Sequence, residues 1–295
     1  MITPNGVTTG HETHMDDITG GILKLTDDLA LTRMGYGAMR LTGPGIWGPP
    51  KDRAEAIRVL RTVADLGLLH IDTSDYYGPH VVNDLIREAL HPYPEGLRIV
   101  TKVGGRRGPD KSWHPALTEP ELIEAVYDNL KRLDLERLDV VNLRMFDTSD
   151  PTIPFSVLAA LMDEGLIAHL GVSNVTAEQL LTCRGIAPVV CVQNAYNLVD
   201  RSDDALVDLC AEQGIAYVPF FPLGGFSPLQ SEVLDEVAAG LDATPQQTAL
   251  AWLLHRSPTI CVIPGTSSVA HLRENVAASG LRLPADALAR LGSLA

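Results

Sequence analysis

Three side chains that could move a proton lie within about thirty residues of one another in the sequence. Asp72 directly follows the apolar run 66–71, Tyr77 lies five residues later, and Lys102 follows the strand-like run 97–101. A lysine ammonium beside a phenol stabilises the phenolate and lowers the pKa of the tyrosine, and an aspartate holds the lysine and balances its charge. Each residue alone also fits a structural role, as a turn or helix cap, a packed loop aromatic or a solvated strand end. Together, at or just after two strand ends, they predict a proton-transfer site.

The segments that must position these residues alternate between strand-like and helix-like patterns. Apolar residues on one helical face, such as Ala56, Ile57 and Leu60, indicate helices. The predicted helices span residues 53–66, 81–90, 119–133, 154–164, 176–183, 202–213, 242–255, 269–279 and 284–291. The predicted strands span residues 34–38, 66–71, 97–101, 138–143, 167–171, 189–193, 215–219 and 259–263. Eight strand–helix units in about 260 residues, without a Pro-, Gly- or Ser-rich linker, predict an α/β fold that is a single closed (β/α)8 TIM barrel.

The N-terminal region differs from the rest of the chain. Residues 1–20 are polar and are predicted to be a flexible tail, and residues 21–295 are predicted to form the barrel. His11 and His14 lie in this tail, where isolated histidines are not expected to bind a metal, and no metal site is predicted. The apolar–turn–apolar pattern of residues 22–32 predicts a short N-terminal β-hairpin.

The composition excludes several classes of function. A net charge of −14 opposes binding to nucleic acid, because phosphates would be repelled. No apolar run approaches the ~20 residues that span a bilayer, and the N-terminus lacks the basic and apolar regions of a signal peptide. The four cysteines have no metal-ligand spacing and are expected to be buried, reduced thiols: Cys183, Cys191, Cys210 and Cys261. These features predict a cytoplasmic protein without a membrane partner.

At the strand ends the sequence resembles the aldo-keto reductases. The run Asp72-Thr73-Ser74-x-x-Tyr77-Gly78 matches their Asp-Thr-Ala-x-x-Tyr-Gly motif, and residues 101–104 match the strand that carries their lysine. The resemblance covers nearly the whole chain, from about residue 31 to residue 275. It implies a (β/α)8 barrel whose bottom is plugged by the hairpin, a tightly held nicotinamide cofactor and the reduction of carbonyl groups.

Polar and aromatic residues after later strands suggest where the cofactor lies. Ser173 and Asn174 end one strand and Gln193 ends the next, and such side chains can hold a carboxamide by paired donors and acceptors, although a helix N-cap would also explain the first two. The resemblance implies that these three residues grip the nicotinamide carboxamide. It also implies that Phe220, in the segment that includes Leu223, stacks on the nicotinamide ring, whereas the apolar run alone would equally fit a core phenylalanine.

The end of the last predicted strand resembles the adenosine-phosphate clamp of the family. Backbone amides at a helix N-terminus suit a phosphate, and the helix here follows Gly265, Thr266 and Ser267. The resemblance implies further contacts to the adenosine part from His271, Glu274 and Asn275. Two of these positions depart from many members of the family, which have lysine where this chain has glycine and arginine where it has histidine. Neutral histidine is a weaker phosphate partner than arginine, so NADPH is the expected cofactor and NADH is possible.

The largest departure from the family concerns a fourth catalytic residue. Family members have a histidine five residues after an aspartate of the fourth strand, and here Arg144 lies five residues after Asp139. Arginine cannot donate a proton at neutral pH, but it is a permanent cation and hydrogen-bond donor. Arg144 is therefore expected to stabilise an oxyanion and to lower the pKa of Tyr77. Other possibilities are pairing with an acidic substrate, reduction of a conjugated C=C bond, or a structural ion pair with Asp147 or Asp110.

The substrate pocket is expected among the strand-to-helix loops, where Met39, Trp47, Trp113 and Met145 could line it, with Tyr76 beside them. We expect an NADPH-dependent reductase of a small aldehyde or ketone, with the hydride from nicotinamide and the proton from Tyr77. The alternatives are an NADPH-dependent reductase of enone C=C bonds and a cofactor-binding regulatory protein with weak catalysis. The sequence indicates neither the identity of the substrate nor an oligomeric state.

Overall fold

A curled parallel sheet organises the molecule. The structure, a computed structural model, describes residues 20–225 and 229–294. Over these residues seven parallel strands pair in the order β11-β10-β9-β8-β5-β4-β3. The strands are β3 (Tyr36–Gly37), β4 (His70–Asp72), β5 (Arg98–Val103), β8 (Leu138–Arg144), β9 (Ile167–Ser173), β10 (Val189–Gln193) and β11 (Ala216–Tyr217). Because neighbours in the sheet follow chain order, the carboxyl ends of all seven strands meet at one end of the molecule.

Residues 259–263 join the two edges of this sheet. Ile260 forms a parallel bridge with Tyr217, and Val262 forms one with Met34. The Gly35 amide donates to the Val262 carbonyl at 2.8 Å. The predicted eighth strand, 259–263, is therefore present as single bridges on both sides, and it closes the predicted barrel.

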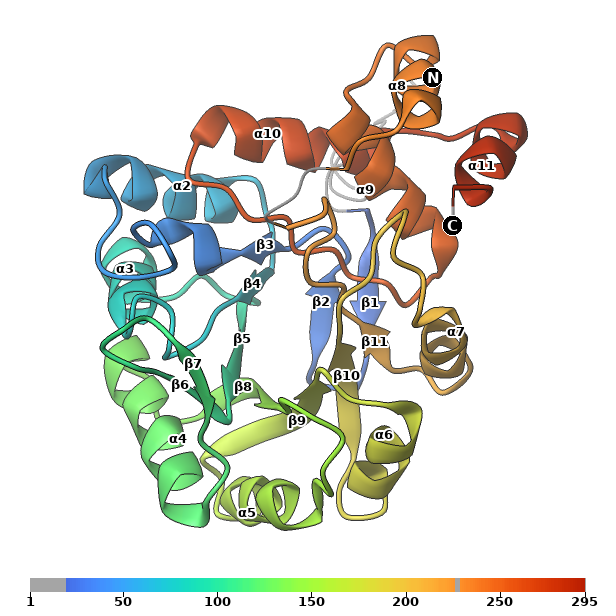
Figure 1. Cartoon of the computed structure of the whole chain (residues 1–295). Helices are drawn as coiled ribbons and strands as arrows, with labels where there is room; N and C mark the ends of the chain where they lie inside the picture. The colour runs from blue at the N-terminus through green and yellow to red at the C-terminus, as the bar shows by residue number, and fades with distance from the viewer. Residues whose placement is uncertain (1–19, 226–228, 295) are drawn as a thin grey trace, which may run out of the picture.

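Helices surround the strands, as Figure 1 shows. They are α2 (Arg53–Asp65), α3 (Val81–Leu90), α4 (Glu119–Leu133), α5 (Thr152–Asp163), α6 (Ala177–Arg184), α7 (Asp204–Glu212), α8 (Glu232–Gly240), α9 (Pro245–Arg256), α10 (Val269–Ala277) and α11 (Ala285–Gly292), with short 3₁₀ turns η1 (Ala38–Leu41) and η2 (Ala278–Gly280). Capping boxes at Thr118, Thr176 and Thr244 fix where three of these helices begin, because each pairs the threonine with a Glu or Gln three residues later. Helix α8 was not predicted, although Ser231 caps it by accepting from the Leu234 amide.

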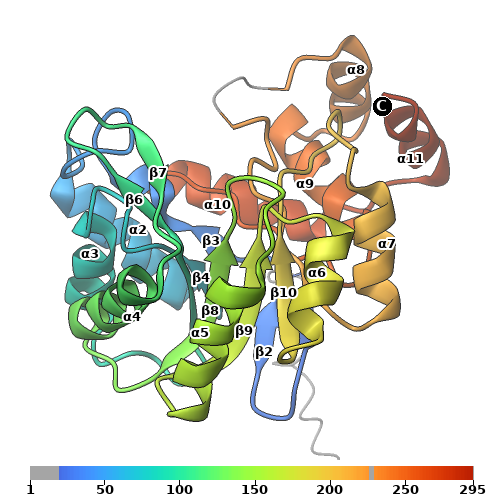
Figure 2. The ribbon, with the colours of Figure 1, turned by 60° about the horizontal axis from the view of Figure 1, so that its bottom comes forward.

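The N-terminal hairpin closes one end of the barrel, as the resemblance implied. Strands β1 (Ile22–Lys24) and β2 (Ala30–Thr32) pair antiparallel. Leu29 and Leu31 are buried in one cluster with strand residues such as Val100, Val140 and Cys261. Figure 2 shows the hairpin at the end of the barrel opposite the carboxyl ends of the sheet strands. The end that carries Asp72 is therefore the open one. The tail predicted for residues 1–20 lies, apart from Gly20, outside the described residues.

A second hairpin, which the sequence analysis did not predict, rises from the loop after β5. Strands β6 (Gly105–Arg107) and β7 (Trp113–Pro115) pair antiparallel, and Figure 2 shows them above the open end of the barrel. Arg107 ties this hairpin to the loop after η1 by donating to the carbonyls of Ile46 and Gly45, both at 2.9 Å. The hairpin therefore forms one side of the mouth of the barrel.

Two sequence-based expectations about the chain as a whole can be compared with the structure. All four cysteines are buried, and none forms a disulfide, as predicted. Over residues 20–225 and 229–294, no helix has the length and apolar character needed to cross a bilayer.

Candidate active site

Asp72 and Lys102 form a buried ion pair at the open end of the barrel. Their strands β4 and β5 are neighbours, so the ends of both strands lie side by side. The Lys102 ammonium donates to both carboxylate oxygens of Asp72, at 2.8 and 2.9 Å, and to the Thr73 carbonyl at 2.8 Å. All three protons of the ammonium thus have partners, which a buried lysine requires.

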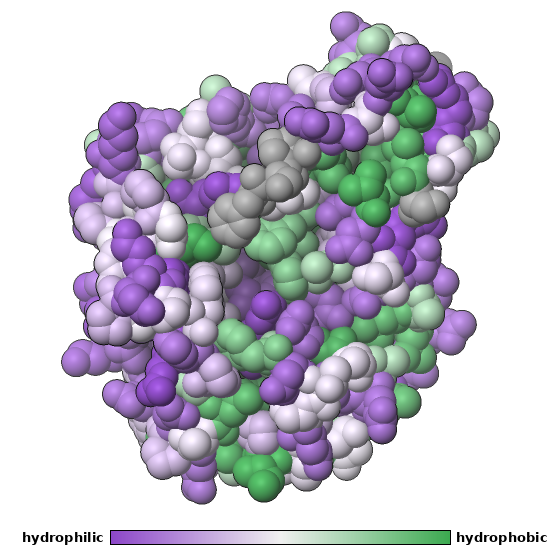
Figure 3. Space-filling view, viewed as in Figure 1, coloured by the Kyte–Doolittle hydropathy of each residue, from purple (hydrophilic) through white to green (hydrophobic). Residues whose placement is uncertain are grey.

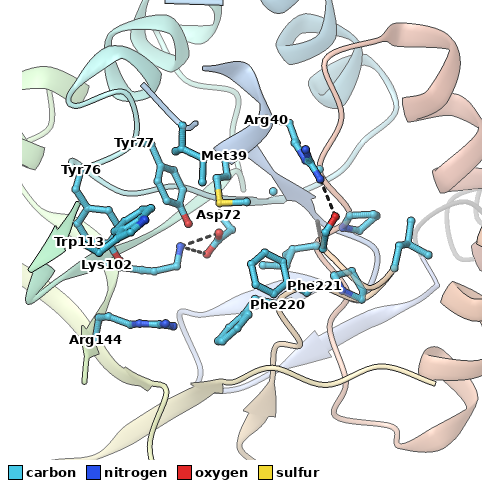
Figure 4. Close-up of a pocket in the computed structure, with 18 of the residues that line it drawn as sticks. Met39, Arg40, Asp72, Tyr76, Tyr77, Lys102, Trp113, Arg144, Phe220 and Phe221 are labelled. Carbon is cyan, nitrogen blue, oxygen red and sulfur yellow. Dashed lines mark hydrogen bonds and ion pairs between the residues drawn. The ribbon is translucent and has the colours of Figure 1, made fainter. Parts of the chain in front are cut away.

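Tyr77 lies beside this pair, on the loop that follows β4. The Lys102 ammonium is 5.0 Å from the centre of the Tyr77 ring. Figure 4 shows the Tyr77 hydroxyl directed toward Lys102 and Asp72. Gly78 has a φ of +102°, which only glycine adopts readily, so the turn that orients Tyr77 depends on this residue. The structure therefore brings the three proton-transfer candidates together.

The pKa of Tyr77 shifts in the direction opposite to the one expected from Lys102 alone. Burial raises the pKa of Tyr77 well above its usual value, the Asp72 carboxylate raises it further, and the Arg144 guanidinium lowers it. The expected lowering by Lys102 fails because Asp72 holds and neutralises that ammonium. Tyr77 consequently keeps its proton at neutral pH, which suits a group that donates a proton to a substrate.

Arg144 ends β8 next to Ser173, the last residue of β9. Its Nη1 donates to Ser173 Oγ at 3.2 Å, and its guanidinium lies 4.9 Å from the centre of the Phe220 ring. The structural ion pairs considered above are not formed: Asp147 accepts from the Ser149 amide, and Asp110 accepts from Ser112. Arg144 is thus placed at the cavity, as Figure 4 shows.

A cavity of about 400 Å³ opens above these residues. Figure 3 shows the hollow near the centre of this face. Its polar lining consists of Arg40, Asp72, Tyr77, Lys102 and Arg144. Its apolar and aromatic lining comes mainly from Met39, Ile46, Tyr76, Trp113, Phe146, Phe220, Phe221, Pro222, Leu223 and Ile263. A volume of this size and a largely apolar wall fit a small-molecule site.

Two of the four predicted substrate contacts line this cavity and two do not. Met39 and Trp113 line it. Met145 is fully buried in the core, because alternation along the chain turns it away and turns its neighbour Phe146 toward the cavity. Trp47 lies outside the lining and packs 5.7 Å from the Arg107 guanidinium, while the adjacent Ile46 lines the cavity.

Of the three residues implied for the nicotinamide carboxamide, Gln193 lies directly beside the ion pair. Gln193 donates through Nε2 to Asp72 Oδ2 at 2.7 Å, and its buried Oε1 has no hydrogen-bond partner among residues 20–225 and 229–294. A buried amide oxygen without a donor fits the NH₂ group of a carboxamide. Ser173 lies one strand away, in register with Gln193. Asn174 instead donates to the Met145 carbonyl at 2.9 Å from a left-handed backbone conformation.

The remaining implied cofactor residues lie along the far side of the cavity and on α10. Phe220, Leu223 and Gly265 line the cavity itself. Ser267 lines an adjoining cavity of about 470 Å³. Of the others, Thr266 and Asn275 are buried, Glu274 is half-buried and His271 is exposed.

Two observations explain how this region departs from the family pattern. A Cβ atom at Gly265 would lie 2.7 Å from the Gly37 carbonyl oxygen, so a lysine there would collide with the backbone of β3. The Val269 amide at the start of α10 donates to the Glu55 carboxylate at 3.0 Å, and this bond lowers the pKa of Glu55. Sequence reasoning missed Glu55 because it lies 214 residues from Val269.

Arg40, Phe146 and Phe221 also line the cavity without having been predicted. Arg40 donates to the Gly225 carbonyl at 2.9 Å, so it joins η1 to the loop after Phe221. For Arg40, the sequence offered one signal, a positively charged side chain in the loop after the first predicted strand. For the two phenylalanines the sequence offered no means to separate cavity lining from core.

The (β/α)8 barrel and its tyrosine–lysine–aspartate site define the chain as an oxidoreductase. The sequence model described as "Aldo/keto reductase family" matches residues 33–295, which extends the resemblance beyond residue 275 to the C-terminus. The chain belongs to the aldo/keto reductase family.

Several known proteins are similar to the chain. Pyridoxine 4-dehydrogenase of Escherichia coli is 58% identical over 272 residues, which cover 90% of this chain and 95% of that protein. The crystal structure of a thermostable aldo-keto reductase in complex with the inhibitor epalrestat is 30% identical, has a TM-score of 0.79 and covers 90% of this chain and 96% of its own. The aldo/keto reductase of Klebsiella pneumoniae in complex with NADP and acetate shares the fold, with 23% identity, a TM-score of 0.74 and coverage of 90% and 92%.

Proposed function

We propose that the protein reduces an aldehyde to the corresponding alcohol with NADPH, and that the aldehyde is a pyridoxal-type aromatic compound. The observation that carries the proposal is the position of Tyr77, whose protonated phenol and the Lys102–Asp72 pair face one cavity lined by aromatic side chains. The reverse reaction, oxidation of the alcohol with NADP, uses the same groups in the opposite direction.

The residues divide the chemistry as follows. When bound, the nicotinamide supplies a hydride to the carbonyl carbon. The π electrons of the carbonyl pass to its oxygen, and Tyr77 donates the proton that completes the alcohol. Arg144, a permanent cation at the same cavity, stabilises the negative charge that develops on that oxygen. Lys102 and Asp72 hold each other in place and keep the site beside Tyr77 electrically balanced.

NADPH is the proposed cofactor because the family and the site both suit it. The buried amide oxygen of Gln193 lacks a partner in the described part of the chain, which suits a carboxamide donor, and Phe220 lies at the cavity for stacking on the ring. Glu55 and the lack of a lysine at position 265 weaken the expected site for the 2′-phosphate of the cofactor. The preference for NADPH over NADH is therefore proposed to be modest.

The proposed substrate class rests on a similar protein and on the aromatic lining of the cavity. The relative at 58% identity is named pyridoxine 4-dehydrogenase, and pyridoxine carries a hydroxymethyl group on a flat aromatic ring. In this chain Tyr76 and Trp113 pack edge to face, 5.6 Å apart, and both line the cavity. Flat aromatic rings pack well against such walls.

The test is the conversion of pyridoxal by the purified protein with NADPH, with pyridoxine identified by liquid chromatography and mass spectrometry. Parallel reactions with benzaldehyde and with an enone separate the possible activities. Formation of alcohols at many turnovers supports the proposal. Saturation of the enone C=C bond with the carbonyl retained would assign the protein to C=C reduction instead. Tight NADPH binding without turnover of any substrate would indicate a regulatory protein and contradict the proposal.

A further inference from the structure

We propose that Arg144 selects aromatic aldehydes that carry an ionised hydroxyl on the ring carbon next to the carbonyl group. This inference rests on the proposed reduction of an aldehyde and names the feature of the substrate that the site recognises. In this arrangement the guanidinium binds two oxygens at once, the carbonyl oxygen and the neighbouring ring oxygen.

The first observation concerns the free donors of Arg144. A guanidinium has five N–H groups in a planar fork. Within the described part of the chain, the hydrogen bond from Arg144 goes through Nη1 to Ser173 Oγ at 3.2 Å. The other N–H groups are left for the cavity that Arg144 lines. A fork of this kind binds two adjacent oxygens, whereas the histidine found here in the family offers one N–H.

The second observation concerns charge. Among residues 20–225 and 229–294, no carboxylate forms an ion pair with Arg144. Asp72, which lines the same cavity, is already paired with Lys102 and accepts from Gln193. The positive charge of Arg144 is therefore balanced by no neighbouring carboxylate, and it lies in a largely apolar cavity, where a charge has a strong preference for a counter-ion. An anionic oxygen on the substrate supplies that counter-ion.

The third observation concerns orientation. The central carbon of the Arg144 guanidinium lies 4.9 Å from the centre of the Phe220 ring and 5.9 Å from the centre of the Phe146 ring. Arg144 and Tyr77 both line the cavity, and Figure 4 shows both side chains directed into it. An oxygen between Tyr77 and Arg144 receives the proton, and the second arm of the fork reaches an oxygen beside it. On a flat ring this second oxygen is the substituent next to the carbonyl group.

The test compares three nitrobenzaldehydes in NADPH-dependent turnover, with the alcohols quantified by chromatography at neutral pH. In 2-hydroxy-5-nitrobenzaldehyde the hydroxyl is ionised and adjacent to the carbonyl. In 4-hydroxy-3-nitrobenzaldehyde it is ionised but remote, and in 2-methoxy-5-nitrobenzaldehyde the adjacent oxygen cannot ionise. The remote isomer controls for the electronic effect of a phenolate on the carbonyl. We expect kcat/KM for the first compound to exceed that for either other compound by at least about tenfold, the range for a charge-assisted hydrogen bond.

Variants assign this preference to Arg144. In Arg144→His, the ratio between the adjacent and the remote isomer should fall below about threefold, and Arg144→Lys, which keeps the charge but not the fork, should lose most of it. Arg106→His is the matched control, because Arg106 is an exposed residue of β6 that pairs with Glu121 and does not line the cavity. Its ratio should equal that of the unaltered protein.

A binding measurement gives a readout that does not depend on turnover. The alcohol 2-hydroxy-5-nitrobenzyl alcohol changes colour when its phenol ionises, so bound and free forms can be compared below the pKa of the free phenol. Binding beside Arg144 should increase the nitrophenolate absorbance, and Arg144→His should abolish the increase.

Reduction of all three aldehydes at similar rates would overturn this inference alone, as would a stronger preference for phenylglyoxylate, a 2-oxo acid. Reduction of no aldehyde would overturn the proposed function, while the absorbance change would still report on Arg144.

Discussion

Lys102 donates to both carboxylate oxygens of Asp72, at 2.8 and 2.9 Å, in a buried ion pair. This relationship determines the state of the neighbouring tyrosine. A lysine that is held and neutralised in this way does little to stabilise a phenolate, whereas the nearby carboxylate disfavours one. Tyr77 therefore keeps its proton, and the Lys102–Asp72 pair influences the pH at which Tyr77 ionises.

Replacement of Asp72 should shift the pH dependence of reduction. In Asp72→Asn the Lys102 charge is no longer balanced and the carboxylate that raises the pKa of Tyr77 is gone, so this pKa falls. Reduction requires protonated Tyr77, and its rate should consequently decline at a lower pH than in the unaltered protein. The measurement is kcat/KM against pH. The control is Asp27→Asn, because Asp27 is exposed in the turn between β1 and β2. An unchanged or higher alkaline limit in Asp72→Asn would contradict this role.

Glu55→Gln should strengthen NADPH binding. The Glu55 carboxylate accepts a hydrogen bond from the Val269 amide at the start of α10, where the resemblance places a phosphate of the cofactor. The negative charge of Glu55 at this position repels that phosphate. We expect the Kd for NADPH to fall about two- to fivefold and that for NADH to change less. Tryptophan fluorescence titration measures both constants, and Glu119→Gln, at the start of α4, is the control. Equal changes for the two cofactors would show that Glu55 does not act on the 2′-phosphate.

Asp75 should make the stability of the protein fall as the pH rises. Burial raises the pKa of Asp75 to about 7, and the charge of Asp128 adds to this effect. A carboxyl whose pKa is raised on folding contributes stability at low pH, and this contribution is lost between about pH 4 and pH 7. Asparagine does not titrate, so Asp75→Asn does not lose stability in this way. The free energy of unfolding of the variant minus that of the unaltered protein should rise by about 2–3 kcal/mol between pH 5 and pH 8. Urea unfolding at both values measures it, and a constant difference would refute the assignment.

Trp113→Ala should weaken the binding of aromatic substrates. Trp113 packs 4.0 Å from the Arg107 guanidinium and edge to face against Tyr76, so it is held at the cavity by the β6–β7 hairpin. Loss of one aromatic wall should raise KM for an aryl aldehyde about tenfold and change kcat less. Tyr127→Ala, an exposed aromatic on α4, should leave KM unaltered. A fall confined to kcat in Trp113→Ala would place this residue in the chemical step instead.

The elements that position the site could largely be read from the sequence. The structure gives α3, α4 and β10 the predicted bounds, because apolar periodicity and capping residues act over a few neighbouring positions. Parallel strands of a barrel end on one face, so residues such as Asp72, Lys102 and Arg144, taken from three strand ends, were expected to meet. The structure places all three at one cavity.

The parts that the sequence did not reveal depend on contacts between distant segments. The β6–β7 hairpin has strands of three residues each, too short for a periodic pattern, and Arg107 holds it through carbonyls about 60 positions earlier. Which of Met145 and Phe146 faces the cavity depends on where β8 ends. The direction of the Tyr77 pKa shift depends on burial and on Asp72, neither of which residue type alone provides.

We propose that Tyr77 protonates the carbonyl oxygen of a substrate reduced with NADPH, and the variant Tyr77→Phe addresses this role. This variant removes the proton donor and keeps the ring that packs 5.5 Å from Tyr76. On the same purified variant we would measure kcat with an aryl aldehyde and the Kd for NADPH. We expect kcat to fall at least about 100-fold, the usual contribution of a general acid, and the Kd to change less than about twofold. Full turnover by Tyr77→Phe would contradict it.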